Sequence, residues 1–232
     1  MIKTRYLAIT AGILSVSISM SANAGIEWEI KDIGAFFGEI MNDASAINDS
    51  GQILGRKFGH GGDFYNSFIT GPNGVGFTDL GFSGSPGGLA ANNINDLGQA
   101  VGYAMGIGAF FTGSNGIGIT YLNILSSRGT DINNSGQIVG NAVFDGFADS
   151  HVFITGPNGT GITDLGTLGR SSNAYGINNS GQVIGSYISS DLSSVRGFIS
   201  DSNGTNLRDL DISGGRNVIG SKINDNGQVD GS

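Results

Sequence analysis

The sequence predicts an all-β protein, built as a β-propeller-like array of about five four-stranded repeats. Three observations predict it: a turn motif that recurs five times, a second turn motif between its copies, and short apolar, β-branched segments around both. Self-similarity at a period of about forty residues is typical of arrays in which each copy packs on its neighbours. Two alternatives remain open, an open β-solenoid-like stack and a fragment of a larger propeller.

The first motif has the form Ile-Asn-x-x-Gly-Gln, and successive copies begin 47, 38, 45 and 46 residues apart. The copies lie near 47–55, 94–102, 132–140, 177–185 and 223–231. Asn, Asp and Ser favour tight turns because their side chains bond the local backbone, and Gly accepts a positive φ without strain. We therefore expect a hairpin at each copy, with Gly136 and Gly181 at positive φ. Substitution of Asn179 should matter less than substitution of Gly181 if its side chain only decorates the turn.

The second motif begins with phenylalanine and runs into Pro-Asn-Gly or Ser-Asn-Gly. Its copies begin at Phe68, Phe110, Phe153 and, in a more divergent form, Phe198. Such turn residues between apolar segments predict a second hairpin in each repeat. Two hairpins give four strands, which is the content of one propeller blade. Paired apolar residues such as Ile138 and Val139 suit strands that are covered on both faces.

The two ends of the array have complementary sequences. The segment Trp28 to Gly34 resembles the end of a repeat, whereas residues 223–231 supply only a first turn motif. We expect Trp28 to Ile33 to share a sheet with Val218 to Val229, which would close a ring of about five blades and cover an exposed edge. A truncated larger ring would show the same ragged end.

Residues 1–24 are predicted to be a signal peptide, and residues 25–232 a single repeat domain. Lys3 and Arg5 form the basic start, an apolar segment follows, and Ala22-Asn23-Ala24 is a cleavage site of the usual small-residue type. Serines interrupt the apolar segment, which disfavours a membrane span. The expected location is therefore secreted, either periplasmic or extracellular, with no membrane span after signal removal.

The composition excludes some classes of function. The formal net charge is −8, and the 11 Lys and Arg residues are scattered, so nucleic acid is not an expected partner. The chain has no cysteine, so its stability must come from packing rather than from disulfides. It is also rich in glycine, with 42 residues, which suits a chain that reverses direction often.

No catalytic, cofactor-binding or metal-binding residue is predicted. The sequence has two histidines, and His151 stands where the other repeats have Asn66, Gly108 and Arg196, so it marks a position in the repeat rather than a catalytic base. His60 lies in a polar, glycine-rich loop. Two histidines and no cysteine supply a hydrolytic triad or a zinc site poorly.

Calcium is the one cofactor alternative, because the Asn-Asp turns offer oxygen atoms. The turns lack the alternating ligand spacing of an EF-hand, and Asn134 and Asn179 replace the carboxylate in two copies. A plain turn is the preferred interpretation. The Gly-x-x-Gly-x-Gly segments at 71–76 and 156–161 are likewise interpreted as hairpin turns, because they match no nucleotide-binding motif.

Several aromatic residues lie close to the segments between repeats. They are Phe37, Phe58, Phe64, Tyr65, Phe82 and Phe144. The preferred interpretation is packing between repeats; the alternative is a groove on one face for a carbohydrate or a peptide.

The segments 164–169 and 172–185 resemble the HAF family of extracellular repeat proteins. The family is named for a His-Ala-Phe tripeptide, and here the corresponding positions keep the phenylalanine in all four copies and the histidine only at His151. The resemblance covers roughly residues 30 to 231. It implies an exported bacterial protein without an assigned activity.

The expected function is that of a non-catalytic binding or surface-interaction module with an unknown protein or carbohydrate ligand. The alternative is an extracellular enzyme that acts on a polysaccharide through loops outside the repeats, with Asp63 or Asp145 as candidate loop carboxylates. The non-repeated loops Gly55 to Tyr65, Val143 to Ser150 and Ser189 to Arg196 are expected on one face, where they would form the binding surface.

Overall fold

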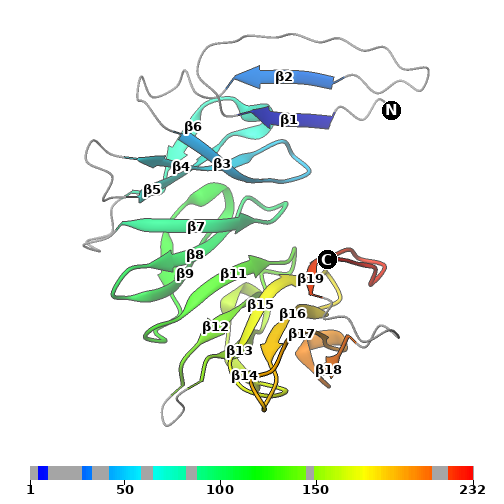
Figure 1. The fold of residues 1–232 in the computed structure, drawn as a ribbon. Helices are drawn as coiled ribbons and strands as arrows, with labels where there is room; N and C mark the ends of the chain where they lie inside the picture. The colour runs from blue at the N-terminus through cyan, green and yellow to red at the C-terminus, as the bar shows by residue number, and fades with distance from the viewer. Residues whose placement is uncertain are drawn as a thin grey trace, which may run out of the picture.

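The structure is a computed structural model that describes residues 5–9, 28–32, 42–58, 65–81, 88–144, 149–210 and 219–231. The predicted all-β, propeller-like array is confirmed. Each complete repeat is one antiparallel sheet of four strands that pair in chain order, and the sheets are stacked one after another (Figure 1).

The strands have the following bounds. The first sheet contains β3 (Asn42–Ile47), β4 (Ile53–Phe58), β5 (Tyr65–Thr70) and β6 (Phe77–Asp79); the second contains β7 (Leu89–Ile94), β8 (Ala100–Ala104), β9 (Gly108–Thr112) and β10 (Ile119–Tyr121). The third contains β11 (Arg128–Ile132), β12 (Ile138–Ala142), β13 (His151–Thr155) and β14 (Ile162–Gly166); the fourth contains β15 (Ser172–Ile177), β16 (Val183–Ile188), β17 (Val195–Ile199) and β18 (Arg208–Asp209). A fifth repeat contributes β19 (Gly220–Ile223) and β20 (Val229–Gly231).

Both predicted hairpins are present in each complete repeat. The Ile-Asn-x-x-Gly-Gln turns join the first strand to the second. The Pro-Asn-Gly and Ser-Asn-Gly segments join the third to the fourth through short 3-10 turns, namely η2 (Pro72–Gly74), η3 (Ser114–Gly116), η4 (Pro157–Gly159) and η5 (Ser202–Gly204). Since neighbouring strands are antiparallel, all of these turns lie at one end of the sheets, which we call the turn end. In Figure 1 the arrowheads of β7 and β11 point toward it.

The predicted pairing between the two ends of the array is wrong. β2 (Trp28–Asp32) runs parallel to β1 (Arg5–Ile9), with Trp28 opposite Arg5, and β19 pairs with β20. β2 pairs with β1 at five positions, and the two form a sheet that is separate from the sheet of β19 and β20. Ile33 lies outside the described residues. β1 also lies within the predicted signal peptide, whose cleavage stays a prediction.

The third sheet is covered on both faces, as its paired apolar residues predicted. Ile138 and Val139 are adjacent in β12 and point to opposite faces, because side chains alternate along a strand. Ile138 packs in a cluster with residues of the second sheet, and Val139 packs in a cluster with residues of the fourth. The hydrophobic core is therefore a series of layers, each shared by two successive repeats. The outermost strands β6, β10 and β18 are short, which limits the exposed sheet edge.

A glycine in the second strand faces the recurring phenylalanine of the third strand. The cross-strand pairs are Gly55 with Phe68, Gly102 with Phe110, Gly140 with Phe153 and Gly185 with Phe198, and all four rings are buried. A Cβ atom at Gly140 would lie 2.8 Å from the Phe153 ring and 2.0 Å from the carbonyl oxygen of Arg128. The first strand has an irregular register at this level in each of these repeats, and also in β19. The missing side chain thus lets both the ring and the bulged first strand approach closely.

The predicted positive φ angles are confirmed, with +73° at Gly136 and +78° at Gly181. A Cβ atom at Gly181 would also lie 2.8 Å from the backbone nitrogen of Asn203, whereas at Gly161 (φ +58°) it would meet nothing within 4 Å. A side chain at Gly161 would therefore add backbone strain alone, whereas a side chain at Gly181 would add both backbone strain and a steric clash.

We predict that Gly161→Ala lowers the free energy of unfolding by about 1 kcal/mol through strain alone, and that Gly181→Ala lowers it by at least about 2 kcal/mol. Gly181→Val should be at least as severe as Gly181→Ala. Urea unfolding followed by circular dichroism measures both. Equal losses for the two alanine variants would contradict the close approach of the turns at Gly181.

Candidate functional site

The asparagine of the first motif holds its own turn together. In the third repeat, Asn133 Oδ1 accepts the backbone N–H groups of Ser135 (3.1 Å) and Gln137 (3.0 Å), while its Nδ2 donates to Gln137 Oε1 (2.8 Å). The same three bonds form around Asn48, Asn95, Asn178 and Asn224. The motif therefore needs an amide at this position, because only an amide donates and accepts here at once.

The same asparagine also binds the next repeat. Nδ2 of Asn133 donates to the backbone carbonyl of Asn178 at 3.1 Å. Equivalent bonds run from Asn48 to Asn95 (2.9 Å), from Asn95 to Asn133 (2.9 Å) and from Asn178 to Asn224 (3.1 Å). We call this series the asparagine ladder. The asparagines that donate in it are buried, so loss of a bond would leave polar groups without water.

A second ladder involves the residue after each of these asparagines. The backbone N–H of Asn134 donates to Oδ1 of Asn179 at 2.9 Å. The corresponding bonds join Asp49 to Asp96, Asp96 to Asn134, and Asn179 to Asp225. Aspartate and asparagine both supply the accepting oxygen, which explains why the motif tolerates either. The condition that Asn179 only decorates its turn is not met, because its side chain links neighbouring repeats.

The 3-10 turns are tied to the same layer. The backbone N–H groups of Asn158 and Gly159 donate to the carbonyl oxygens of Ser135 (3.1 Å) and Gly136 (3.0 Å). Across the boundary between repeats, Nε2 of Gln137 donates to Oδ1 of Asn203 at 3.2 Å. The predicted turns at 71–76 and 156–161 are thus confirmed as structural turns, and the turn end is one continuous hydrogen-bonded layer.

A shallow hollow of about 320 Å³ opens where the five first turns meet. Its lining comes from all five repeats: Ile47, Asn48, Asp49, Ile94, Asn95, Asp96, Ile132, Asn134, Ile177, Asn178, Asn179, Ile223, Asn224 and Asp225. The lining includes three aspartates and no Lys or Arg, so this end is acidic. Among the described residues, no group of three or more His, Cys, Asp or Glu side chains is arranged to hold a metal ion. One side-chain oxygen of each of Asp96, Asn134, Asn179 and Asp225 accepts a backbone N–H group from the preceding repeat.

Asp131 is a buried carboxylate that joins three repeats. Its Oδ1 accepts from the backbone N–H of Ile132 (2.8 Å) and from Nδ2 of Asn93 (2.6 Å), and its Oδ2 accepts from the backbone N–H of Ile177 (2.8 Å). Burial raises the pKa of Asp131 to about 6, and the three hydrogen bonds oppose that rise. The corresponding positions elsewhere are Ala46, Asn93, Gly176 and Lys222, so the repeat pattern alone does not predict the carboxylate.

His151 contacts an aspartate on the neighbouring strand. The side chain is buried at the start of β13, and its Nδ1 lies 2.9 Å from Oδ2 of Asp164 on the neighbouring strand β14. The equivalent pair in the fourth repeat is Arg196 with Asp209, at 2.5 Å. In the third and fourth repeats, the residue two positions before the recurring phenylalanine therefore pairs with the aspartate of the fourth strand. Phe144 packs beside His151, with ring centroids 6.2 Å apart, as predicted for a packing aromatic.

The remaining sequence candidates lie wholly or partly outside the described residues. Among them are His60, the loop carboxylates Asp63 and Asp145, and the side chains of Phe37, Phe58, Phe64, Tyr65 and Phe82.

The end opposite the turns, which we call the loop end, carries the connections that vary between repeats. The segments 59–64, 105–107, 143–150 and 189–194 each join the second strand of a sheet to the third. They leave the sheets at the same end because the strands are antiparallel. The strands that flank the three predicted loops therefore end at the same end of the array, as expected for a shared face. Residues 59–64 and 145–148 of these loops are not described.

Solved structures with the same fold agree with this architecture. TolB from Agrobacterium tumefaciens matches with a TM-score of 0.52 at 14% identity, over 71% of this chain and 63% of that one. A puromycin-hydrolyzing peptidase from Mycobacterium tuberculosis matches with a TM-score of 0.52 at 11% identity, over 76% and 30%. A prolyl endopeptidase matches with a TM-score of 0.52 at 10% identity, over 77% and 29%.

The chain spans less than two thirds of each of these proteins, and identities this low show the fold alone. TolB is a β-propeller protein, so the match supports the propeller-like assignment. No family model matches the sequence, and no curated protein matches it. In the described part of the chain, no helix is long and apolar enough to cross a membrane.

We predict that Asn133→Ala lowers the free energy of unfolding by about 3 kcal/mol, because it leaves buried donors and acceptors unpaired in two repeats. Asn224→Ala is the matched control. Asn224 makes the same bonds within its turn but is exposed, and it donates to no other repeat among the described residues, so the expected loss is about 1 kcal/mol. Urea unfolding compares the two. Equal losses would show that the ladder adds nothing beyond the turn.

The raised pKa of Asp131 leads to a second prediction, on how stability depends on pH. Its pKa in the folded protein, about 6, lies above the ordinary value of 3.8, so the folded state favours the neutral form. Asp131 therefore costs stability above pH 6, and this cost disappears as the pH falls below 3.8. The unfolding free energy of the wild type minus that of Asp131→Asn should rise by about 2–3 kcal/mol between about pH 7.5 and about pH 3.5. A difference that is constant with pH would contradict a raised pKa.

Proposed function

We propose that this chain is an exported, non-catalytic binding module that contacts its ligand at the loop end. The observation that carries the proposal is that the two ends of the array differ: the turn end holds the repeats together, and the loop end carries the variable connections. At the turn end, the recurring Asn and Gln side chains bond their own turn or the next repeat, so they hold the array together. At the loop end, the connections differ in length and sequence, which is where binding residues occur on rigid repeat scaffolds.

Export is supported by the predicted signal peptide at residues 1–24 and by the resemblance to the HAF family. The absence of cysteine agrees with a protein that depends on packing, and the buried layers between sheets supply that packing. A protein or a carbohydrate is the proposed class of ligand.

The experiment uses the purified protein on a glycan array and a peptide array. Replacement of the loop segments 105–107, 143–150 and 189–194 by Gly-Ser sequences, one at a time, should weaken binding at least about tenfold in one or more cases, a loss of about 1.4 kcal/mol. Asn158→Gly is the turn-end control, because Asn158 is exposed with φ +53°, which glycine adopts readily. This control should bind as the wild type does.

Three outcomes would contradict the proposal. One is an absence of binding on both arrays, and another is binding that depends on Asn158 but on none of the loops. The third is turnover of glycosidic substrates that is lost when Asp63 or Asp145 is replaced, which would favour the polysaccharide-active alternative.

A further inference from the structure

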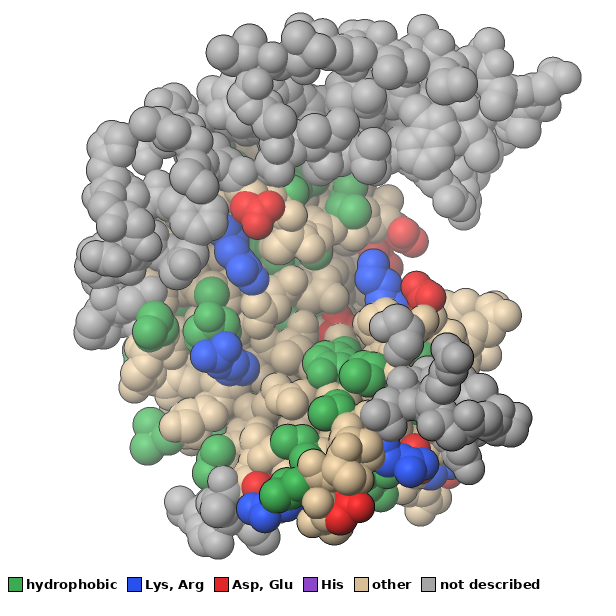
Figure 2. Space-filling view, viewed as in Figure 1, with side chains coloured by type: hydrophobic (Ala, Val, Ile, Leu, Met, Phe, Trp, Pro, Cys, Tyr) green, Lys and Arg blue, Asp and Glu red, His purple; other side chains and the backbone are tan. Residues whose placement is uncertain are grey.

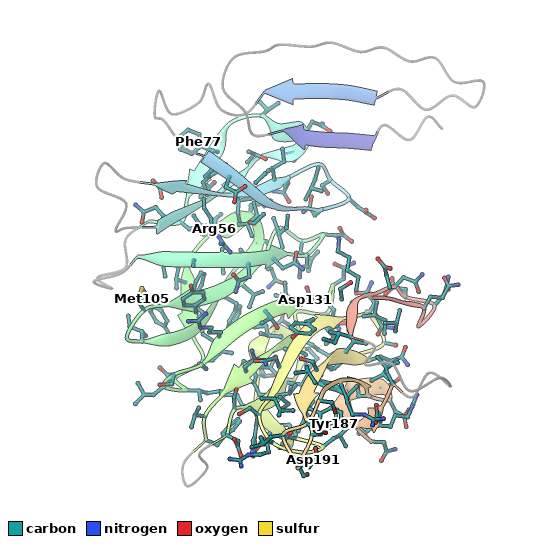
Figure 3. The ribbon with its side chains drawn as sticks, in the orientation of Figure 1. Arg56, Phe77, Met105, Asp131, Tyr187 and Asp191 are labelled. Atoms are coloured by element: carbon teal, nitrogen blue, oxygen red, sulfur yellow. The ribbon has the colours of Figure 1, made fainter. Side chains whose placement is uncertain are left out.

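A strip of side chains at the loop end combines positive charge with exposed apolar groups. We call it the Arg–Tyr strip, and it consists of Arg56, Asn92, Tyr103, Met105, Leu125 and Arg128. Its members come from the first three repeats. Figure 3 shows Arg56 and Met105 on the same side of the molecule, and Figure 2 shows basic and hydrophobic side chains next to one another on that side.

The two arginines are fixed in place by neutral groups. The Arg56 guanidinium donates through Nε and Nη2 to the carbonyl of Ala91 (3.1 and 3.0 Å) and through Nη2 to Oδ1 of Asn92 (2.8 Å). The Asn92 side chain in turn donates to the carbonyl of Gly129 at 2.7 Å, next to Arg128. The Arg128 guanidinium lies over the Tyr103 ring, 4.4 Å from its centroid. Both positive charges therefore stand in a defined geometry.

Neither arginine forms an ion pair within the described part of the chain, in contrast to three other arginines. Arg170, Arg196 and Arg208 pair with Asp149, Asp209 and Asp201. Asp43 stands opposite Arg56 in the β3–β4 register. The Arg56 guanidinium donates its hydrogen bonds to Ala91 and Asn92 of the second repeat instead. The strip thus presents cationic groups on a molecule whose formal net charge is −8.

The apolar part of the strip is continuous with the arginines. Met105 is 55% exposed and Leu125 is 73% exposed. The β8–β9 hairpin and the segment before β11 are held together by the bond from the Ala109 N–H to Ser127 Oγ (2.8 Å). Arg, Tyr and Met are enriched in protein–protein interfaces, and Arg and Tyr are frequent among the residues that dominate their energy. This composition favours a protein partner over a polysaccharide.

The turn end of the same molecule has the complementary character. Asp49, Asp96 and Asp225 surround the hollow, whose lining includes no Lys or Arg. Beside them Leu97 is 50% exposed and Ile117 is 72% exposed, and the bond from the Asn115 N–H to the Leu97 carbonyl holds their two turns together. An acidic rim with adjacent apolar side chains matches a cationic strip with adjacent apolar side chains.

We propose that the Arg–Tyr strip of one copy docks on the turn end of a second copy, so that the protein associates head to tail. The two surfaces differ, so each copy keeps one of them free after the first contact and the assembly can extend. This inference rests on the proposed function, because it names a partner for the loop end. The two proposals can fail separately, because self-association is measured without the glycans or peptides that test the proposed function.

The experiment is sedimentation velocity on the purified protein over a range of concentrations up to about 0.3 mM, which detects dissociation constants in the micromolar to submillimolar range. The wild type should form dimers and longer species. Arg128→Glu and Asp49→Lys should each weaken self-association at least about tenfold. Arg170→Glu changes the net charge as Arg128→Glu does but lies outside the strip, so it should associate as the wild type does. Asp43→Asn should strengthen association, because it removes a negative charge opposite Arg56.

A mixture of the two weakened variants makes the test independent of folding defects. Arg128→Glu keeps an intact turn end and Asp49→Lys keeps an intact strip, so mixing them should restore dimers with the affinity of the wild type. A mixture that stays monomeric would overturn the head-to-tail arrangement, as would a wild type that is monomeric over the whole range. An Arg170→Glu variant as weak as Arg128→Glu would show that net charge, and not the strip, controls association.

Discussion

The architecture depends on one buried amide group that is used by two repeats at the same time. Asn133 accepts two N–H groups of its own turn and donates to the carbonyl of the next asparagine in the series. Aspartate would lack the donor, and serine could not reach all four partners. The position is therefore restricted to asparagine, and the glutamine four residues later is restricted because it must accept the remaining amide proton. The recurrence of the motif follows from hydrogen-bond satisfaction rather than from any ligand.

This constraint also explains which parts of the repeat vary. Because the ladder locks the turn ends together, differences in repeat length must be absorbed at the loop end. The spacing of 38 residues between the second and third motifs coincides with the tight β8–β9 connection, which has only residues 105–107. The corresponding connection in the third repeat runs from 143 to 150. Surface loops tolerate such changes because loop closure costs little more entropy as length grows.

Much of the fold could be predicted from the sequence because its constraints are local and repeat. Positive φ at Gly136, two hairpins per repeat and strands covered on both faces all follow from residue types at fixed spacing. Interactions between repeats were harder to predict. The role of Asn179 depends on the next copy of its own motif. The expected pairing of Trp28 to Ile33 with the last hairpin was wrong because β2 pairs with β1, a segment that the sequence assigned to the signal peptide.

The candidate binding residues were also missed, for a related reason. Arg56, Tyr103 and Arg128 occupy positions that differ from one repeat to the next, so no recurrence draws attention to them. Their juxtaposition arises only when repeats one to three are stacked, through Asn92 and the Tyr103 ring. Asp131 could have been noticed as the one carboxylate at its repeat position, but its burial among three repeats is a property of the stacked array.

The asparagine ladder also gives the array a direction. Every amide of the ladder donates from the earlier repeat to the later one, so a sheet cannot be reversed in the stack without unpairing a buried group. The two ends of every complete sheet are also distinct, because both hairpin turns of a repeat lie at the turn end and the variable connection lies at the loop end. Sequence change can therefore accumulate at the loop end without weakening the contacts that hold the repeats together, and this separation of stability from variation makes such an array suited to binding.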